Sequence, residues 1–133
     1  MPHLNRDPIV ALGACITAVH TIVSRNVGPL DSAVITIGRV SSGTVANVIP
    51  DEAEMEGTIR TFDDEVREIV LRRLKEVLES TAAAYMCTCH LEIRNGYPVT
   101  RNSDDGVTKV ERCALKIVPD SNHLNVNCGL SIL

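Results

Sequence analysis

Apolar residues recur at helical spacing in the first part of the chain. Asp7-Pro8 has the features of a helix start, because aspartate caps free N–H groups and proline suits the first helical position. A helix is predicted from there to about Ser24, and one of its stripes carries Ile9, Leu12, Ile16, Val19 and Val23. The opposite side is also apolar, with only Thr17, His20 and Thr21 to meet water. Such a helix needs cover on two sides, either from a second subunit or from the C-terminal third of the chain.

Two segments after this helix alternate between apolar and polar positions, which is typical of strands with one buried face. The first runs from Ser32 to Val40 and the second from Glu52 to Phe62, after Pro50. One face of the second strand carries Ala53, Met55, Gly57 and Ile59, and the other carries Glu52, Glu54, Glu56, Thr58 and Arg60.

A second helix is predicted after Asp63, which can serve as its N-cap. Its apolar stripe carries Val66, Ile69, Val70, Leu74, Val77, Leu78, Thr81 and Tyr85. The opposite face is charged, so this helix should pack on one sheet face and meet water on the other. Met86 to Arg94 is predicted to be a further strand, and Asp104 to Val118 a weaker amphipathic helix. Asn122 to Leu133 is predicted to be an irregular tail.

This order of elements predicts an α+β fold, a ferredoxin-like two-layer sandwich in which an antiparallel sheet carries two helices on one face. The first strand of such a unit is missing, or reduced to the stub Met1 to Leu4. Its absence would expose a sheet edge unless another segment pairs there.

Composition narrows the functional classes. Hydrophobic residues make up 44% of the 133 positions and aromatic residues 2%, so the core must be aliphatic. The net charge of −4 and the lack of a basic run argue against a nucleic-acid partner. No apolar run approaches the roughly 18–20 residues of a membrane span, and no signal peptide is visible. Five cysteines without regular spacing favour free thiols in a reducing, cytoplasmic compartment.

Two polar residues near the second strand could bind a ligand. Asn47 lies in the preceding loop and Arg60 near the strand's far end, so one rigid element could present an amide and a guanidinium to a carboxylate. The plainer interpretation is that Asn47 satisfies a turn and Arg60 pairs with a glutamate. Cys87-x-Cys89-His90 contains residue types that bind metals. A metal site is not expected here, because strand alternation places the cysteines on one face and the histidine on the other.

Several separated motifs resemble one protein family. They are Pro2-His3-Leu4, Asp7-Pro8-Ile9, Ile22-Val23-Ser24-Arg25-Asn26-Val27, Pro29-Leu30-Asp31-Ser32-Ala33-Val34, Asn47-Val48-Ile49-Pro50-Asp51, Glu56-Gly57-Thr58-Ile59-Arg60-Thr61-Phe62 and Gly96-Tyr97-Pro98. Together they resemble the lid, or dimerisation, domain of the co-catalytic zinc amidohydrolases and metallopeptidases. That family includes aminoacylase, hippurate hydrolase, auxin-conjugate hydrolases and glutamate carboxypeptidase, and the aminoacylase and hippurate hydrolase branch is most similar. The resemblance covers Pro2 to about Asn102.

The resemblance implies a lid inserted into a larger catalytic domain, and a homodimer formed through the first helix and the sheet edge. It also implies that an asparagine and an arginine thirteen residues later bind the substrate's carboxylate, often in the partner's active site. Asn47 and Arg60 match these positions, since 60 − 47 = 13. His3 matches the second histidine of the family's Gly-Gly-His-Ala-Ala-x-Pro-His-Leu motif and is the third substrate-binding candidate. The first histidine would lie upstream of Met1.

The family's zinc ligands lie in its catalytic domain, and none of them is recognised here. Residues 1–98 are therefore expected to be the lid, and residues 99–133 a remnant of the return into the catalytic domain. The predicted function is a carboxylate-binding and dimerisation fragment of an N-acyl amino acid amidohydrolase, inactive alone, whose two zinc ions and missing catalytic domain belong to the parent enzyme. The alternatives are a free-standing regulatory module that binds a small carboxylate, and a purely structural dimer.

Overall fold

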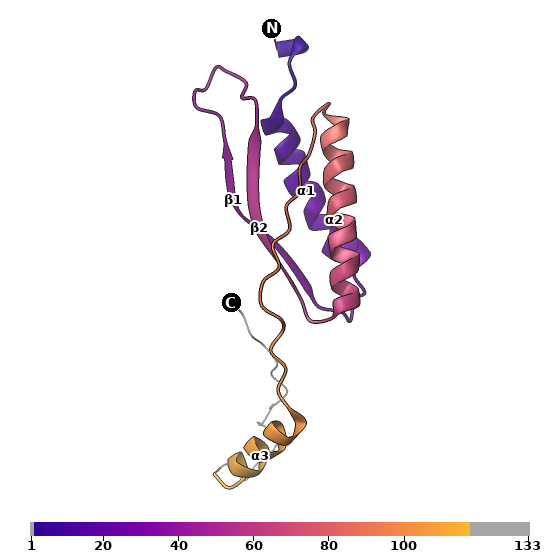
Figure 1. The fold of residues 1–133 in the computed structure, drawn as a ribbon, viewed down its shortest axis with the longest axis vertical. Coiled ribbons are helices and arrows are strands. Elements are labelled where there is room, and N and C mark those ends of the chain that lie inside the picture. The colour runs from indigo at the N-terminus through magenta and orange to yellow at the C-terminus, as the bar shows by residue number, and fades with distance from the viewer. Residues whose placement is uncertain (1, 118–133) are drawn as a thin grey trace. The chain divides into compact units, whose positions relative to one another are not determined.

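The computed structural model describes residues 2–117, which divide between Arg94 and Asn95 into two compact units. The first unit contains η1 (Pro2–Leu4), α1 (Pro8–Asn26), β1 (Ala33–Ser42), β2 (Ala53–Thr61) and α2 (Asp64–Ala84), as Figure 1 shows. The second unit contains α3 (Asp104–Ala114), which ends earlier than the predicted Val118. The predicted tail from Asn122 to Leu133 lies outside the described residues.

The two long helices begin where the sequence predicts. Asp7 Oδ1 accepts hydrogen bonds from the backbone N–H groups of Ile9 and Val10, at 3.0 and 3.2 Å. Asp63 Oδ1 does the same for Glu65 and Val66, at 2.8 and 3.3 Å. Each carboxylate therefore satisfies two N–H groups that have no partner within the helix, and lies at the positive end of the helix dipole.

β1 and β2 form an antiparallel hairpin whose register runs from Ala33 opposite Thr61 to Ser42 opposite Ala53. A bulge interrupts the register between Ile37 and Arg39. The predicted alternation is confirmed, because Ala33, Ile35, Met55 and Ile59 pack in or against the core while the residues between them on each strand are exposed. Two other apolar residues of β1, Val34 and Val40, are each 51% exposed.

Gly57 allows β1 and β2 to approach closely. A Cβ atom at this position would lie 2.3 Å from the Thr36 carbonyl oxygen and 3.0 Å from Cδ1 of Ile37. The distance to the backbone oxygen is too short for any side chain, so the close approach of the two strands depends on a glycine here.

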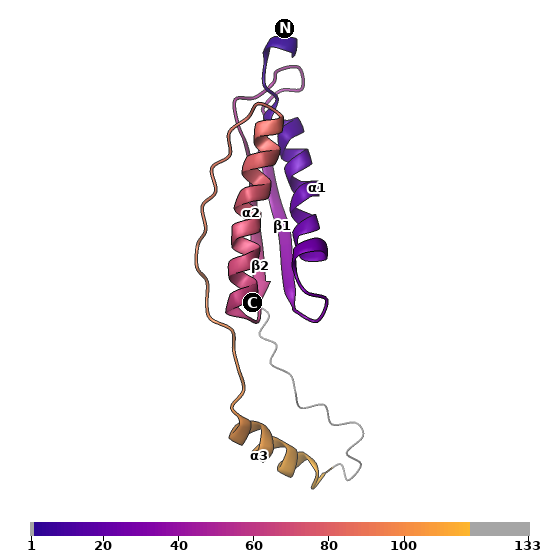
Figure 2. The same ribbon diagram turned by 90° about the vertical axis from the view of Figure 1, so that its right-hand side faces the viewer.

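The core of the first unit lies between the hairpin and the two helices, which pack side by side on the same face of the hairpin (Figures 1 and 2). Its buried members are Cys15, Val19, Ile22, Ile35, Val66, Val70, Leu74 and Leu78. The predicted α+β class, with two helices on one face of an antiparallel sheet, is therefore confirmed.

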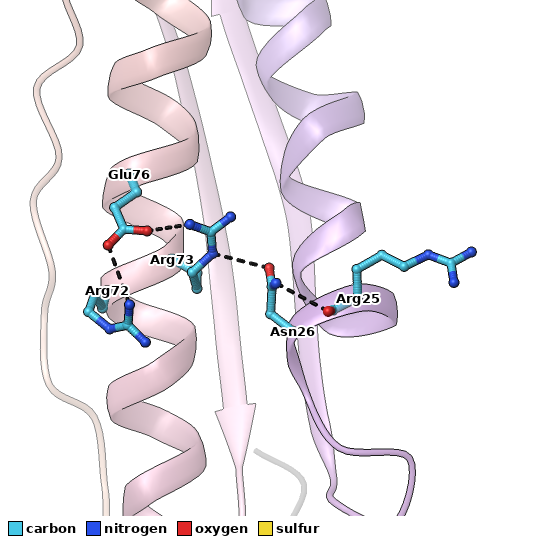
Figure 3. A network of polar contacts seen from close by, with 5 residues as sticks. All are labelled: Arg25, Asn26, Arg72, Arg73 and Glu76. Atoms are coloured by element: carbon cyan, nitrogen blue, oxygen red, sulfur yellow. Dashed lines mark hydrogen bonds and ion pairs between the residues drawn. The ribbon is translucent and has the colours of Figure 1, made fainter.

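A polar network joins the C-terminal end of α1 to α2 (Figure 3). Arg73 donates from Nε to the Asn26 side-chain oxygen at 3.2 Å and forms an ion pair with Glu76. The amide nitrogen of Asn26 donates in turn to the Arg25 carbonyl at 3.1 Å. This network ties the C-terminal end of α1 to the middle of α2.

The segment from Met86 to Arg94, predicted to be a strand, is extended but belongs to no β-ladder of the described sheet. The prediction of a sheet strand was therefore wrong. Met86 adopts a φ of 57°, and the Cys87 N–H bonds back to the Ala82 carbonyl at 2.9 Å, which ends α2 in a Schellman-type turn. Residues 87–94 then run along the unit in extended form, with Cys89 and Leu91 packed against the core.

α1 is apolar enough to meet the length and composition criteria of a membrane span, with a mean hydropathy of 1.4 over its most apolar window. The expectation that no segment of the chain would do so was wrong. A core helix meets the same criteria, and α1 supplies four buried side chains, which are Ala11, Cys15, Val19 and Ile22. Its composition by itself is therefore weak evidence for a membrane.

Candidate functional site

Arg60 lies near the end of β2, opposite Val34 of β1, and its side chain is half-buried. Its Nη1 atom is buried without a hydrogen-bond partner in the described part of the chain. Glu56 of the same strand pairs with Arg39 at 2.9 Å instead. A buried guanidinium N–H without an acceptor is costly, and an anionic oxygen is the partner that would satisfy it best.

Asn47 lies in the loop between β1 and β2, as predicted, and is exposed. The register places this loop beside Ala53, whereas Arg60 lies 60 − 53 = 7 residues further along β2. At about 3.3 Å per residue, that separation is roughly 23 Å. The prediction that one rigid element holds Asn47 and Arg60 to a common carboxylate is therefore wrong within a single copy of the chain.

His3 lies in η1 and is exposed. Both views place η1 at the same end of the unit as the β1–β2 loop (Figures 1 and 2). The loop also approaches the start of α1, because a Cβ atom on Gly43 would lie 3.8 Å from Cδ1 of Ile9. The structure therefore groups His3 with Asn47 at one end and leaves Arg60 at the other.

The outer side of α1 forms a second candidate surface. Helical spacing puts Ile9, Val10, Gly13, Thr17 and Thr21 on this side, and all five are exposed. The Thr17 hydroxyl donates to the Gly13 carbonyl at 3.1 Å, and the Thr21 hydroxyl to the Ala18 carbonyl at 2.6 Å. Because both hydroxyls bond back to their own helix, the threonines can present their methyl groups outward.

This outer surface of α1, defined by these five residues, carries no formal charge. The sequence signal for it is the run from Pro8 to Ser24, which contains no aspartate, glutamate, lysine or arginine. Small residues at Gly13, Thr17 and Thr21 would let another helix approach closely. The apolar outer side is visible in the sequence, whereas the internal hydrogen bonds of its hydroxyls depend on side-chain rotamers and are not.

The thiols of the first unit cluster around the core without forming a metal site. Burial, reinforced by Cys89 and Cys87, raises the pKa of the Cys15 thiol, and burial also raises the pKa of Cys89. His90 is exposed while Cys87 and Cys89 are half-buried, as alternation predicts. Within residues 2–117, no three of histidine, cysteine, aspartate and glutamate converge to hold a metal ion.

Comparison with known proteins decides the family. Residues 1–86 match the model of the peptidase dimerisation domain. The chain belongs to this family. The Bacillus subtilis N-acetyl-L-cysteine deacetylase is 43% identical over 114 residues, which are 86% of this chain and 27% of that protein. The N-acetyldiaminopimelate deacetylase of Anoxybacillus flavithermus is 46% identical over 103 residues, which are 77% of this chain and 27% of that protein.

A solved structure agrees with this assignment. The Bacillus subtilis YXEP protein, a dinuclear metal-binding peptidase of the M20 family, superposes with a TM-score of 0.66 and 34% sequence identity. The alignment covers 84% of this chain and 28% of that one. This peptidase dimerisation domain therefore spans about a quarter of the length of the relatives it matches. Its described residues do not fit a dinuclear metal centre, because they offer no converging ligand set.

Proposed function

We propose that this peptidase dimerisation domain binds the substrate carboxylate and mediates self-association in a metal-dependent N-acyl amino acid amidohydrolase. The two deacetylase relatives support the substrate class, since the names of both specify an N-acetylated amino acid. An α-carboxylate is common to such substrates. The metal ions, zinc by the resemblance, belong to a catalytic domain outside the described residues, so the share of this chain is binding and not hydrolysis.

The observation that carries the carboxylate proposal is the buried, unpartnered Nη1 of Arg60. Structural arginines in such positions normally have an acceptor, because an unpaired buried donor loses its hydration without compensation. A carboxylate could accept from two N–H groups of the guanidinium at once. The half-burial of the side chain would hold the fork in place before the ligand arrives.

Self-association offers a way to combine Arg60 with Asn47. In a two-fold symmetric pair joined along the outer edge of β1, the two hairpins run in opposite directions. The loop of one copy, with Asn47 and nearby His3, then lies at the end of the joined sheet that carries the partner's Arg60. The separation of these residues within one copy supports a carboxylate site that takes groups from two copies.

The same pairing would cover the outer surface of α1. That surface is apolar, uncharged and exposed, with Ile9 at 49% and Val10 at 52% exposure. Exposed apolar surface of this kind is typical of interfaces. We also propose a reducing, cytoplasmic setting, which the free Cys15, Cys87, Cys89 and Cys113 support.

A titration with N-acetyl-L-methionine, followed by NMR of the arginine side-chain N–H groups, tests carboxylate binding. We expect saturable shifts at Arg60 in the millimolar range, and their loss in Arg60→Gln. Arg39 is the matched control, because it lies on the neighbouring strand and already pairs with Glu56. Equal shifts at both arginines, or none at Arg60, would contradict the proposal.

Sedimentation equilibrium of Val10→Asp tests the self-association surface. An aspartate near the start of α1 suits the helix dipole, so the substitution should leave the fold intact. We expect the native chain to be dimeric and Val10→Asp to be monomeric. Val110→Asp on α3 is the control, since Val110 is similarly exposed, at 56%, and lies in the other unit. A native monomer, or a dimer that survives Val10→Asp, would refute this interface.

A further inference from the structure

The chain passes from the first unit into the second at Asn95-Gly96, since the division between the units falls between Arg94 and Asn95. Both residues of this pair are exposed, and residues 87–103 belong to no helix or strand. A Cβ atom on Gly96 would meet nothing within 4 Å. The pair therefore lies in exposed backbone that neither a helix nor a sheet restrains.

An asparagine followed by a glycine favours a reaction within the chain. The asparagine side chain is short enough to reach backbone groups next to it in the sequence. Glycine has no Cβ atom, so the backbone can adopt the conformations that bring the glycine nitrogen onto the asparagine Cγ atom, and no side chain shields that nitrogen. In the whole sequence, Asn95 is the only asparagine that precedes a glycine.

The reaction of such a pair balances with water as its only co-reactant. The deprotonated backbone nitrogen of the glycine attacks Cγ of the asparagine, the new C–N bond closes a succinimide ring, and the side-chain nitrogen leaves as ammonia. Water then opens the ring at either of its two carbonyl carbons. One product is an aspartate, and the other is an isoaspartate, in which the main chain runs through the former side chain. Asparagine counts among the chemically labile residues of proteins.

We propose that Asn95-Gly96 is a self-modification site, at which the chain converts an amide into a carboxylate at the connection between its two units. The observation that carries this is the coincidence of the one asparagine–glycine pair with exposed, unrestrained backbone. The reaction needs only this pair and water. It therefore proceeds whether or not the chain binds a carboxylate or self-associates.

A second glycine pair, Asp105-Gly106, shows how folded backbone opposes the same chemistry. An aspartate can also close a succinimide, with water as the leaving group. This pair lies in the first turn of α3, where the Gly106 N–H donates to the Ser103 hydroxyl oxygen at 3.2 Å. The attacking nitrogen is thus engaged, and the helical backbone holds it away from Cγ. We expect Asp105 to stay unchanged while Asn95 converts.

The other described asparagines precede larger residues. Asn26 and Asn47 are each followed by a valine, whose branched Cβ atom crowds the backbone nitrogen. The side chain of Asn26 also accepts a hydrogen bond from Arg73 (Figure 3). Asn102 is exposed in the same connection as Asn95 but precedes a serine. Asn102 is therefore the matched internal control for the effect of the glycine.

The conversion changes both the charge and the main chain of the connection. The net charge moves from −4 to −5, since −4 − 1 = −5. The new carboxylate follows Arg94, whose guanidinium already pairs with Glu92 at 2.9 Å, so two carboxylates then compete for one cation. An isoaspartate also adds one carbon atom to the main chain between the two units. Molecules that have reacted therefore differ physically from those that have not.

Peptide mapping of the full chain by mass spectrometry tests this site. The chain is incubated at neutral and at mildly alkaline pH in water enriched in heavy oxygen, and is then digested in acid, which stops the reaction. We expect Asn95 to convert progressively, to incorporate heavy oxygen and to yield isoaspartate among the products. Conversion should be faster at the alkaline pH, because the attacking nitrogen must lose its proton.

Gly96→Ala is the deciding variant. The new Cβ atom would meet open space, so the fold should be unchanged, which circular dichroism verifies. We expect this variant to convert Asn95 about tenfold more slowly, because alanine restricts the backbone and crowds the nitrogen. An Asn95 that stays unconverted at both pH values, converts no faster than Asn102, or converts equally fast in Gly96→Ala would overturn the proposal.

Discussion

Replacing Gly57 by alanine tests whether the close approach of β1 and β2 determines the stability of the first unit. The new methyl group would lie 2.3 Å from the Thr36 carbonyl oxygen, whereas a comfortable carbon–oxygen contact is about 3.3 Å or longer. The strands must therefore separate by roughly 1 Å at this point. The obstacle is a backbone atom, so no side-chain rotation relieves it.

The magnitude follows from two opposing effects. Overpacking of this kind costs about 1–3 kcal/mol. Replacing a strand glycine by alanine raises the free energy of unfolding by about 0.5–1 kcal/mol, because the unfolded chain loses conformational freedom. We expect Gly57→Ala to lower the free energy of unfolding by about 1–2 kcal/mol, which for a unit of this size lowers the Tm by roughly 5–15 °C.

Urea unfolding followed by far-UV circular dichroism measures this change. Gly38→Ala is the matched control, because Gly38 lies on the neighbouring strand and a Cβ atom there meets nothing within 4 Å. We expect the control to be neutral or slightly stabilising. If both variants unfold at the same urea concentration, the close approach at Gly57 does not carry the stability assigned to it.

Two further predictions concern the end of α2 and the buried thiol. Met86 has a left-handed φ of 57° and is 67% exposed, so Met86→Gly should stabilise the chain by about 0.5–1 kcal/mol, whereas Tyr85→Gly, at a right-handed position, should destabilise it in the same urea assay. Burial raises the pKa of Cys15 in the folded state above the value of about 8.5 in the unfolded chain. This contribution to stability is therefore complete below about pH 8.5 and declines as the pH rises toward the folded value. Urea midpoints between pH 7.5 and 10 should fall less steeply for Cys15→Ala than for the native chain, and parallel curves would exclude a contribution from this thiol.

The candidate site could be predicted from the sequence only in part. The residue types and the spacing of Asn47 and Arg60 are visible in the sequence, and so is the likeness of their motifs to a family. Their positions at opposite ends of a hairpin depend on the strand register, which is a relation between residues far apart in the chain. The lack of a partner for Nη1 of Arg60 likewise depends on what the neighbouring strand and side chains leave within reach.

Local interactions along the chain specify where both long helices begin and which face of the hairpin is buried. Asp7 and Asp63 begin their helices because a side-chain oxygen reaches N–H groups two or three residues away. The alternation of β1 and β2 determined which face is buried, since successive side chains of a strand point to opposite sides.

Features that involve residues distant in sequence follow only from the folded arrangement. Residues 87–94 alternate as a strand should, yet they remain unpaired, because a strand needs a second strand within hydrogen-bonding distance. Side-chain alternation is a property of one segment and can therefore be read from the sequence. A β-ladder requires two segments within hydrogen-bonding distance, so its presence or absence depends on the fold.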